Sequence, residues 1–278
     1  MQIRADLHTH SRYSDGKYTP QEVCERAKAN GVQLLSITDH DTMGGDEEKQ
    51  KYAKENGLLY VRGWEVSAYM GGTKVHITGY NCQQNADYFA FLQERIDSSY
   101  ARAEENIQKL KSFGYTLSLD DVRARLVDKN GPIHTTHVAR AAAAVSGGLS
   151  AGFFMSEYLT VGKPAFSSIG RPTPQVAVDI IHKLGGVASI AHPGRITLSP
   201  ERKENLIKAL CAYGVDGIEG IYTTHTNEET AYYLSIAEKY GLLVTGGSDT
   251  HKENEKYSIG TPLFYPSEKL LEKLGINA

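Results

Sequence analysis

The chain has 278 residues, a formal net charge of −3, 40% hydrophobic residues and 23% charged residues, which is ordinary for a soluble globular protein. The slightly acidic balance offers no basic footprint for duplex DNA, although a metal-rich site can still attract phosphate. No apolar run approaches the roughly 20 residues of a membrane helix, and no apolar signal region opens the sequence. The three scattered cysteines, Cys24, Cys82 and Cys211, argue against a disulfide framework, so we expect a cytoplasmic protein with no membrane partner.

Short apolar runs alternate with amphipathic stretches in the first part of the chain. Thr19, Pro20 and Glu22 predict a helix start, as N-cap, first helical residue and partner in a capping box. Gly31 and Gly57 predict the ends of two helices. We expect strands over residues 3–7, 32–38, 58–65 and 74–80, and helices over residues 20–30 and 46–56.

The alternation breaks between Asn85 and Lys163. Asp87–Phe113 has a long helical pattern, the alanine-rich Val138–Val145 has a shorter one, and no convincing strand interrupts them. We interpret residues 85–163 as a helical insertion. The remaining segments, 1–84 and 164–278, would then form one barrel domain.

The alternation resumes at Thr173 and Pro174, which predict another helix start. We expect helices over 174–184, 201–213 and 227–240, and strands over 187–191, 215–222 and 242–246. Alternating strand and helix units predict an α/β fold with a parallel sheet and helices outside, either closed as a barrel or open.

Residue types that bind metals fall at or near the ends of most predicted strands. One such His or Asp is more often a hydrogen-bonding loop residue or a helix cap than a ligand. The loops that follow the strands of a βα barrel open on one face, however, so residues far apart in sequence would converge there. Because nearly every strand contributes, the set favours a metal site: His8, His10, Asp39, His40, Asp41, Glu65, His76, His192, Glu219, Asp249 and His251.

The ligand types in this set limit which metals are expected to bind. Imidazole and carboxylate ligands without thiolates suit Zn, Mn or Fe in a reactive site better than a closed structural Zn site. The set exceeds what one tetrahedral ion needs, so we expect at least two divalent metals. Such metals can make a hydroxide at neutral pH and hold the attacking and leaving oxygens of a phosphate ester.

Six motifs follow one another along nearly the whole chain. They are Asp6-Leu-His8-Thr-His10-Ser11, Thr38-Asp39-His40-Asp41, Gly63-Trp-Glu65-Val-Ser67, His76-Ile-Thr-Gly79-Tyr80, Ala191-His192-Pro193-Gly194-Arg195 and Ser248-Asp249-Thr-His251. Together they resemble the PHP (polymerase and histidinol phosphatase) superfamily. Within it, the sequence is most similar to the branch of nucleoside 3′,5′-bisphosphate phosphatases and 5′–3′ exoribonucleases, which carries a helical insertion after the fourth motif.

The resemblance implies a distorted (βα)7 barrel with three divalent metals (Mn, Zn or Fe). Asp15 by itself would look like a turn residue, and only the resemblance makes it a ligand. Glu65 would bridge two metals. The implied ligands are His8, His10, Glu65 and Asp249 for one metal, Asp15, His40 and His251 for a second, and Glu65, His76 and His192 for the third.

Three further residues are candidates for binding substrate and for catalysis. Arg195 is placed to bind a phosphate oxygen. His137 matches the His of an Arg-Pro-His motif usual in this branch, but Thr135 and Thr136 replace the Arg and Pro. This departure removes a phosphate-binding cation and leaves open whether the substrate is the same bisphosphate. His225 matches a substrate-side His, with a surface position at a helix start as the alternative, and either His137 or His225 would protonate the leaving oxygen.

We therefore expect a phosphoesterase that hydrolyses phosphate monoesters of nucleotides or small sugar phosphates by a metal-bound hydroxide, with the insertion forming one wall of the site. Cyclic phosphate dihydrolase, histidinol phosphatase, metallo-amidohydrolase and noncatalytic metal-binding roles stay open. An exoribonuclease acting on RNA 5′ ends is a further alternative. It would need a groove for the RNA chain, and no stripe of basic and aromatic residues is visible in the sequence.

Overall fold

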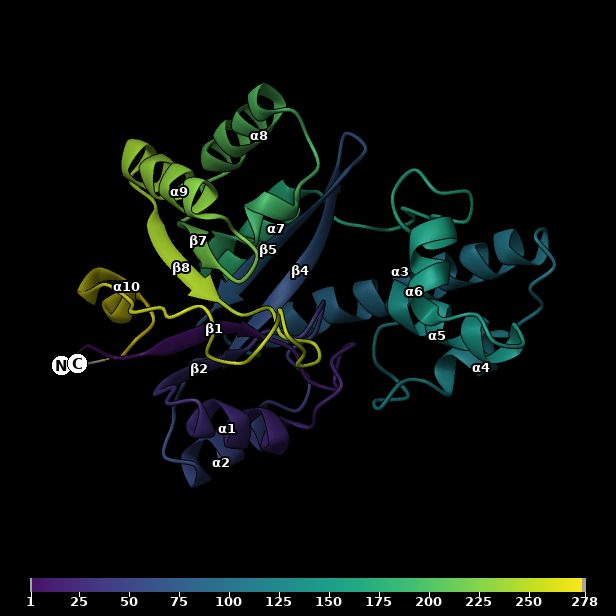
Figure 1. Cartoon of the computed structure of the whole chain (residues 1–278), viewed down its shortest axis with the longest axis horizontal. Coiled ribbons are helices and arrows are strands. Elements are labelled where there is room, and N and C mark those ends of the chain that lie inside the picture. The colour runs from purple at the N-terminus through teal and green to yellow at the C-terminus, as the bar shows by residue number, and fades with distance from the viewer. Residues whose placement is uncertain (1, 277–278) are drawn as a thin grey trace.

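Strands gather into a barrel-like core with helices outside it, and a group of helices extends to one side, at the end away from the two termini (Figure 1). The computed structural model describes residues 2–276. The strands are β1 (Ala5–Thr9), β2 (Leu34–Ile37), β3 (Leu59–Tyr60), β4 (Gly63–Met70), β5 (Thr73–Tyr80), β6 (Val187–Ile190), β7 (Gly217–Tyr222) and β8 (Leu243–Gly247). The helices are α1 (Pro20–Ala29), α2 (Asp46–Glu55), α3 (Ala86–Lys111), α4 (Leu119–Arg123), α5 (Thr135–Val145), α6 (Ala151–Phe154), α7 (Pro174–Lys183), α8 (Pro200–Ala212), α9 (Asn227–Tyr240) and α10 (Glu268–Lys273), with a π-helical turn at Met155–Leu159 and a 3₁₀ turn at Pro193–Arg195.

The strands form two sheets, ordered β1-β2-β3 and β4-β5-β6-β7-β8. The sheets meet at both edges. Thr9 bridges Thr250 in parallel beside β1, and His40 bridges Glu65 in parallel between β2 and β4. The two sheets are therefore connected through isolated bridges, and this interrupted arrangement confirms the expected α/β fold of a distorted barrel. The predicted strand over 58–65 is split into β3 and the start of β4, and both parts follow β2 along the same edge.

One part of the barrel is antiparallel, contrary to the parallel sheet expected from the sequence. β4 pairs antiparallel with β5, and β5 pairs antiparallel with β6. Gly71 and Gly72 form the turn between β4 and β5, with φ of 56° and 82°. Two consecutive glycines accept these positive φ values without a Cβ penalty, which suits a tight hairpin. As a result, His76 lies inside a strand rather than after its carboxyl end.

The helices α1 and α9 begin at capping boxes formed by their own side chains. Thr19 accepts a hydrogen bond from the Glu22 amide, and the Glu22 carboxylate accepts one from the Thr19 amide, which completes the predicted capping box. Thr226 and Glu229 form the same arrangement at the start of α9. Each satisfies backbone amides that the first helical turn leaves without partners.

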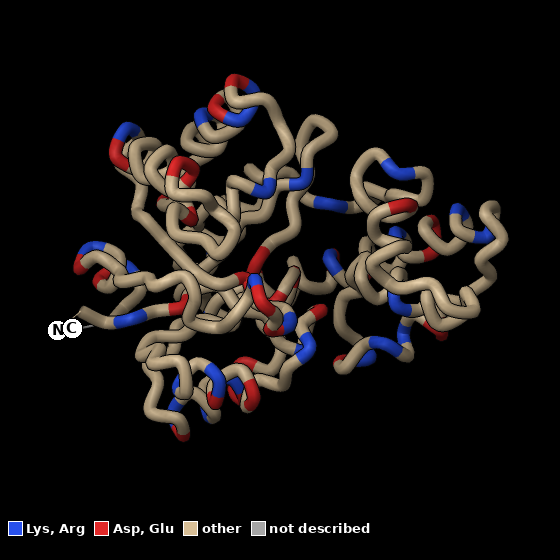
Figure 2. Tube along the Cα trace, in the orientation of Figure 1, with Lys and Arg blue, Asp and Glu red and all other residues tan. Residues whose placement is uncertain are grey.

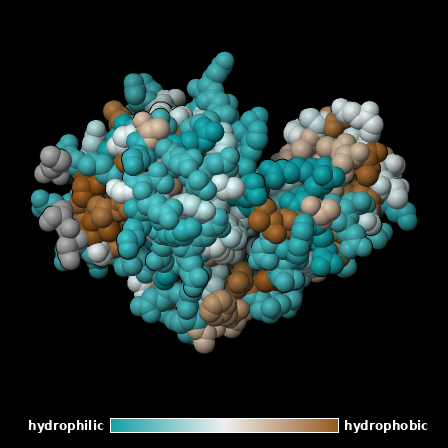
Figure 3. Space-filling view, turned by 90° about the horizontal axis from the view of Figure 1, so that it is seen from below, coloured by the Kyte–Doolittle hydropathy of each residue, from teal (hydrophilic) through white to brown (hydrophobic). Residues whose placement is uncertain are grey.

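Among residues 2–276, buried apolar side chains form four separate groups, of which two are larger than the others. The larger packs β4–β8 against α7, α8 and α9, with Trp64 and Ile77 fully buried. The second lies among α3–α6 and includes Leu110 and Phe154. The face seen in Figure 3 is mostly hydrophilic, with smaller, separate apolar areas. Among residues 2–276, no helix is long and apolar enough to cross a membrane.

Candidate metal centre

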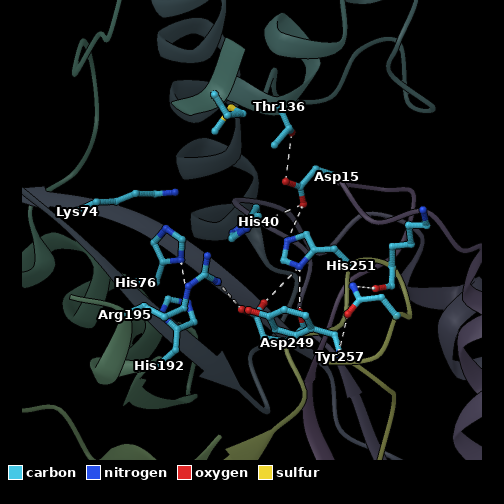
Figure 4. A pocket seen from close by; sticks show the side chains of 13 residues that line it. Asp15, His40, Lys74, His76, Thr136, His192, Arg195, Asp249, His251 and Tyr257 are labelled. Carbon is cyan, nitrogen blue, oxygen red and sulfur yellow. Dashed lines mark hydrogen bonds and ion pairs between the residues drawn. The ribbon is translucent and has the colours of Figure 1, made fainter. Parts of the chain in front are cut away.

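Side chains from six of the strands or the loops after them converge at one end of the barrel. Six of them line a common cavity of about 380 Å³, which Figure 4 shows from close by, and His8, His10 and Glu65 are buried behind these six: Asp15, His40, His76, His192, Asp249 and His251. His8 lies in β1 and His10 follows it, His40 follows β2, Glu65 lies in β4, His76 in β5, His192 follows β6, and Asp249 and His251 follow β8. Asp15 comes from the loop between β1 and α1.

Glu65 is the centre of the cluster and is fully buried. Its Oε2 lies 2.9 Å from His40 Nδ1 and 3.3 Å from the Nε2 atoms of both His8 and His10. Its Oε1 lies 2.7 Å from His76 Nδ1 and 2.8 Å from His192 Nε2. One carboxylate therefore faces five imidazoles, which is the arrangement expected of a bridging ligand.

Asp249 and Asp15 complete the cluster on the side of His10 and His251. Asp249 Oδ1 lies 3.2 Å from His10 Nε2 and 3.4 Å from His251 Nδ1. Asp15 Oδ1 lies 3.0 Å from His251 Nε2 and 4.0 Å from His40 Nε2. The structure thus brings together all nine residues that the resemblance names as ligands.

Several of the atoms that face one another have no hydrogen-bond partner among the described residues, whereas Glu65 Oε1 lies within hydrogen-bond distance of His76 Nδ1 and His192 Nε2. Among residues 2–276, the buried Nε2 of His8, both ring nitrogens of His10, Oε2 of Glu65 and Oδ1 of Asp249 are unsatisfied. Leaving so many polar atoms buried without partners is costly unless a cation lies among them. The donor set of imidazole and carboxylate, without thiolate, therefore fits divalent Zn, Mn or Fe.

Three groups of ligand atoms are compact enough to surround an ion. Within each, the atoms lie within 4.8 Å of one another. His10 belongs to two groups, whereas the resemblance gives it to one. His192 is outside these groups, although it contacts Glu65 and its Nε2 lies 3.2 Å from His76 Nδ1. The groups are His8, His10, Glu65 and Asp249; His10, Asp15, His40 and His251; and His40, Glu65 and His76.

The electrostatics keep the carboxylates ionised. Burial raises the pKa of Glu65, but His76, His40 and His8 outweigh it and hold the pKa well below its usual value. Burial likewise raises the pKa of Asp249, and His8 and His10 reverse the effect, so this pKa is also held well below its usual value. Two buried anions at the centre of the cluster favour binding of cations.

Two of the acidic residues near predicted strand ends support ligands instead of joining the cluster. Glu219 accepts hydrogen bonds from His8 Nδ1 (3.0 Å) and from the His192 amide (2.6 Å), which leaves His8 Nε2 facing Glu65. A carboxylate behind a ligating His fixes the ring orientation in this way. Asp39 contacts Lys49 Nζ at 2.6 Å and accepts a bond from Ser14 Oγ at 2.6 Å. Burial raises the pKa of Asp39, but Lys49 and His10 lower it to about 2.

Several of these residues have a strained backbone. His192 has a φ of 28°, Asp249 a φ of 51° and Asp41 a φ of 54°. Such values are unusual for residues other than glycine and persist only where surrounding contacts enforce them. The Glu219 bond to the His192 amide and the His8 carbonyl bond to the Asp249 amide (2.7 Å) are such contacts. The strain directs both side chains toward the cavity.

The insertion reaches the site through the first turn of α5. Thr136 Oγ1 donates to Asp15 Oδ2 at 3.2 Å, and Arg140 donates to the Asp15 carbonyl at 2.7 Å. His137 Nε2 donates to the Ser14 carbonyl at 3.0 Å, and its Nδ1 accepts from the His134 amide at 3.1 Å. Both nitrogens of His137 therefore bond to backbone, so this residue holds the Asp15 loop and does not present a free nitrogen to the cavity.

His225 is also held by backbone groups. Its Nε2 accepts from the Gly194 amide at 3.2 Å, and its Nδ1 donates to the Gly220 carbonyl at 3.3 Å. It does not line the cavity around the ligands. Arg195 does line it, with its guanidinium 2.7 Å from Asp249 Oδ2 and half of its side chain exposed.

Three residues of the site are not predicted by any of the sequence patterns above. Lys74 lines the cavity from β5, and Tyr222 donates to Asp249 Oδ2 at 2.8 Å. The ring of His134, whose Nε2 is buried and unsatisfied among the described residues, lies 5.9 Å from the ring of His40. Lys74 and His134 each lie close to a matched motif, which is the only local signal they carry.

Comparisons with known proteins agree with this site. Residues 6–140 match the PHP domain model. The chain is 33% identical to a 5′–3′ exoribonuclease of Haemophilus influenzae, over 90% of this chain and 91% of that protein. It is 34% identical to a 3′,5′-nucleoside bisphosphate phosphatase of Chromobacterium violaceum, over 90% of this chain and 88% of that protein.

Two solved structures share the fold along nearly the full length. One, named as an amidohydrolase from Chromobacterium violaceum with bound sulfate, has a TM-score of 0.84 and 32% identity, with 96% and 95% of the two chains covered. The other, assigned as a metal-dependent phosphoesterase from Bifidobacterium adolescentis, has a TM-score of 0.84 and 26% identity, with 98% and 95% covered. The fold, the cluster and these relatives define a metal-dependent phosphoesterase, a hydrolase of phosphoric esters. The chain belongs to the PHP domain family, which confirms the resemblance found in the sequence.

Proposed function

We propose that the chain hydrolyses phosphate monoesters of nucleotides or of related small sugar phosphates. The observation that carries this proposal is the ring of buried, unsatisfied nitrogen and oxygen atoms around Glu65, beside a cavity of about 380 Å³ that other residues of the cluster line. A cavity of this size admits a phosphate group with part of its leaving group.

The ligand set supports three divalent metals, Mn, Zn or Fe, at the three groups of ligand atoms. When bound, such metals neutralise charge on phosphate oxygens and activate water for attack. His192 would join the group formed by Glu65 and His76, because its Nε2 lies 2.8 Å from Glu65 Oε1.

The side chains around the ligands bind and orient the phosphate. Arg195 offers its guanidinium at the rim, where its bond to Asp249 Oδ2 fixes its direction. Guanidinium groups bind phosphate through two parallel hydrogen bonds, and this suits a half-exposed arginine. Because His137 and His225 use both ring nitrogens on backbone groups, we assign them to positioning the Asp15 loop and the Gly194 turn, in place of the proton transfer expected from the sequence.

Trimming of RNA from its 5′ end is a second candidate, which a separate observation favours. Beside Asp15 and His251, a cavity of about 460 Å³ is lined by cations from distant parts of the chain. Figure 2 shows Lys and Arg positions on both the barrel and the insertion where the two face each other. Clustered cations of this kind bind successive phosphates of a single strand. The lining cations are Arg12, Lys17, Arg125, Arg140 and Lys252.

Phosphate release by metal-reconstituted protein tests the proposal. The panel is AMP, 3′-AMP, adenosine 3′,5′-bisphosphate, cyclic ribose phosphates, histidinol phosphate and a short 5′-phosphorylated RNA. We expect release from at least one nucleotide, and loss of it in His192→Ala. His182→Ala is the matched control, because His182 lies on α7, binds Asp216 and has a side chain 39% exposed. Failure of all substrates with metals verified as bound would contradict the proposal.

A further inference from the structure

The leaving oxygen of a phosphate ester gains negative charge as its bond to phosphorus breaks, and the two histidines expected to act on it are engaged elsewhere. His137 and His225 each use both ring nitrogens on backbone groups. A fixed positive group at the place where charge develops stabilises the transition state. A free cation at the position of the leaving oxygen is therefore the candidate for this role.

The position of the leaving oxygen follows from how two cavities meet. A second cavity of about 550 Å³ lies between the β4–β5 turn, the insertion and the segment after His192. Lys74, Met155 and Arg195 line both this cavity and the one around the ligands, so they mark the junction between the two. With phosphorus at the metal centre and the rest of the substrate in the second cavity, the leaving oxygen lies at this junction.

The lining of the second cavity suits the organic part of a substrate. Met155, Leu159, Phe166 and Ile196 contribute apolar surface to it. Ligand pockets combine such surface with a few placed polar groups. The other cavity that adjoins the ligands, beside Asp15, is lined mainly by charged and polar side chains and offers little apolar surface. The departing group therefore extends from the metal centre past the junction.

Of the two cations at the junction, Lys74 is the one whose charge is free. The guanidinium of Arg195 is held by Asp249 Oδ2 at 2.7 Å and by the Tyr222 hydroxyl at 3.4 Å. Within residues 2–276, the Lys74 ammonium forms no hydrogen bond or ion pair, and the side chain is exposed. In Figure 4 it points into the cavity from the side of His76, and no dashed line reaches it.

Strand β5 fixes the direction in which Lys74 points. Side chains two residues apart in a strand share one face, so Lys74 lies on the same face as the ligand His76. The pairing of Lys74 with Tyr69 across the β4–β5 hairpin holds its backbone in place. A lysine carries a compact point charge on a long stem, which lets the ammonium reach the leaving oxygen from this position.

We propose that Lys74 is a catalytic residue that stabilises the negative charge on the leaving oxygen as its bond to phosphorus breaks. The oxygen of a water molecule forms the new bond to phosphorus, and the electron pair of the broken bond stays on the leaving oxygen beside the ammonium. The attacking water releases one proton and the departing group takes one up, so the products are an alcohol and inorganic phosphate. The inference rests on the proposed phosphatase function and adds the group that acts at the leaving position.

Replacing the leaving oxygen with sulfur tests this role. A thiolate is a much weaker base than an alkoxide, so its departure depends less on a nearby cation. Single-turnover rates are measured for the best monoester of the substrate panel and for its analogue with sulfur in place of the leaving oxygen. Lys74→Gln should lower the rate for the oxygen ester about 10- to 100-fold and the rate for the sulfur ester less than about 3-fold, since an open cavity weakens the effect relative to an enclosed site. Because Lys74 is exposed, the variant should fold normally.

Three further variants separate charge at this position from other effects. Lys74→Arg keeps a cation and should retain most of the rate for the oxygen ester, and losses equal to those of Lys74→Gln would overturn the inference. Lys252→Gln removes the other lysine that lines the cavity around the ligands and should affect both esters by the same factor. A selective loss for the oxygen ester in Lys252→Gln, with none in Lys74→Gln, would put the leaving oxygen on the other side. Lys54→Gln, an exposed position of α2 outside these cavities, should leave both rates unchanged.

Binding of vanadate distinguishes failure of this inference from failure of the proposed function. Five-coordinate vanadate carries oxygens at both the attacking and the leaving positions, whereas inorganic phosphate stays tetrahedral. Calorimetry on metal-loaded protein should show that Lys74→Gln weakens vanadate binding about 10-fold or more and phosphate binding less than about 3-fold. Vanadate binding with this dependence, but no phosphate release from any ester, would overturn the proposed function and keep Lys74 at the leaving position. Equal weakening for the two anions, or equal losses for the two esters, would overturn the inference.

Discussion

The barrel and the insertion both contribute histidines near the metal centre, but the two groups of rings are used differently. His10, from the barrel, faces Glu65 and Asp249, and both of its buried ring nitrogens lack hydrogen-bond partners within residues 2–276. His137, from the insertion, bonds one nitrogen to the Ser14 carbonyl and the other to the His134 amide. The first arrangement leaves the nitrogens available to a metal, and the second uses them to fix backbone. Residue type and proximity alone do not distinguish a ligand from a support.

The contrast extends to charge and to backbone. On the barrel side, buried Glu65 and Asp249 keep low pKa values because imidazoles surround them, and the strained φ of His192 and Asp249 directs ligand side chains inward. On the insertion side, Thr136 and Arg140 of α5 donate hydrogen bonds to Asp15. The barrel therefore builds the centre, and the insertion holds one ligand loop against it.

The largest expected effect comes from neutralising the centre of the barrel side. Glu65→Gln keeps the shape but removes the charge that faces five imidazoles, so we expect activity to fall by more than the roughly 10–100-fold typical when a residue that only supports a ligand is lost. Metal content by elemental analysis should fall as well. Glu47→Gln, on the exposed side of α2, is the control. Unchanged metal content in Glu65→Gln would contradict the bridging role.

The next effect tests how the barrel supports the loop that carries Asp15. Lys49 is buried, and its ammonium lies 2.6 Å from Asp39, which also binds Ser11 and Ser14. Lys49→Met leaves the Asp39 charge buried and unpaired, so the free energy of unfolding should fall by about 3–5 kcal/mol. Urea denaturation measures the loss. Lys51→Met, which removes an exposed cation of the same helix, should change it by less than about 1 kcal/mol.

Sequence patterns predicted the parts of this site that depend on local order. A ligand-type residue at a strand end and a Thr-Pro-x-Glu helix start each involve neighbours in the chain, so His40 and Thr19 were assigned correctly to their elements. The strand alternation does not predict the antiparallel hairpin, because the reversal of the chain depends on the two positive-φ residues Gly71 and Gly72 alone. The role of His137 depends on Ser14, a partner 123 residues away in the chain, which no periodicity reveals.

His8 combines the two arrangements, because one ring nitrogen bonds to a supporting carboxylate and the other faces the metal cluster. Its Nδ1 donates a hydrogen bond to Glu219, and its Nε2 points toward Glu65 in the cluster. Glu219→Gln would weaken the hydrogen bond that orients the His8 ring but would remove no ligand. We therefore expect metal affinity or activity to fall about 10- to 100-fold. Competition with a chelator measures the affinity. An effect as large as that of Glu65→Gln would mean that Glu219 is itself a ligand.

The smallest effect concerns the insertion side and depends on pH. Burial lowers the pKa of His137 to about 4, from 6.5. The unfolded chain therefore binds more protons than the folded protein between these values, and the stability that His137 contributes above pH 6.5 is lost as the pH falls toward 4.

Between pH 7 and pH 5, this one group should lower the free energy of unfolding by about 2 kcal/mol, and His137→Gln should lack that part of the loss. Urea denaturation of chelator-treated proteins at the two pH values isolates the difference from metal release. If His137→Gln kept the full wild-type loss between pH 7 and pH 5, His137 would not be held in its neutral form, and its assignment as a support for the Asp15 loop would have to be given up.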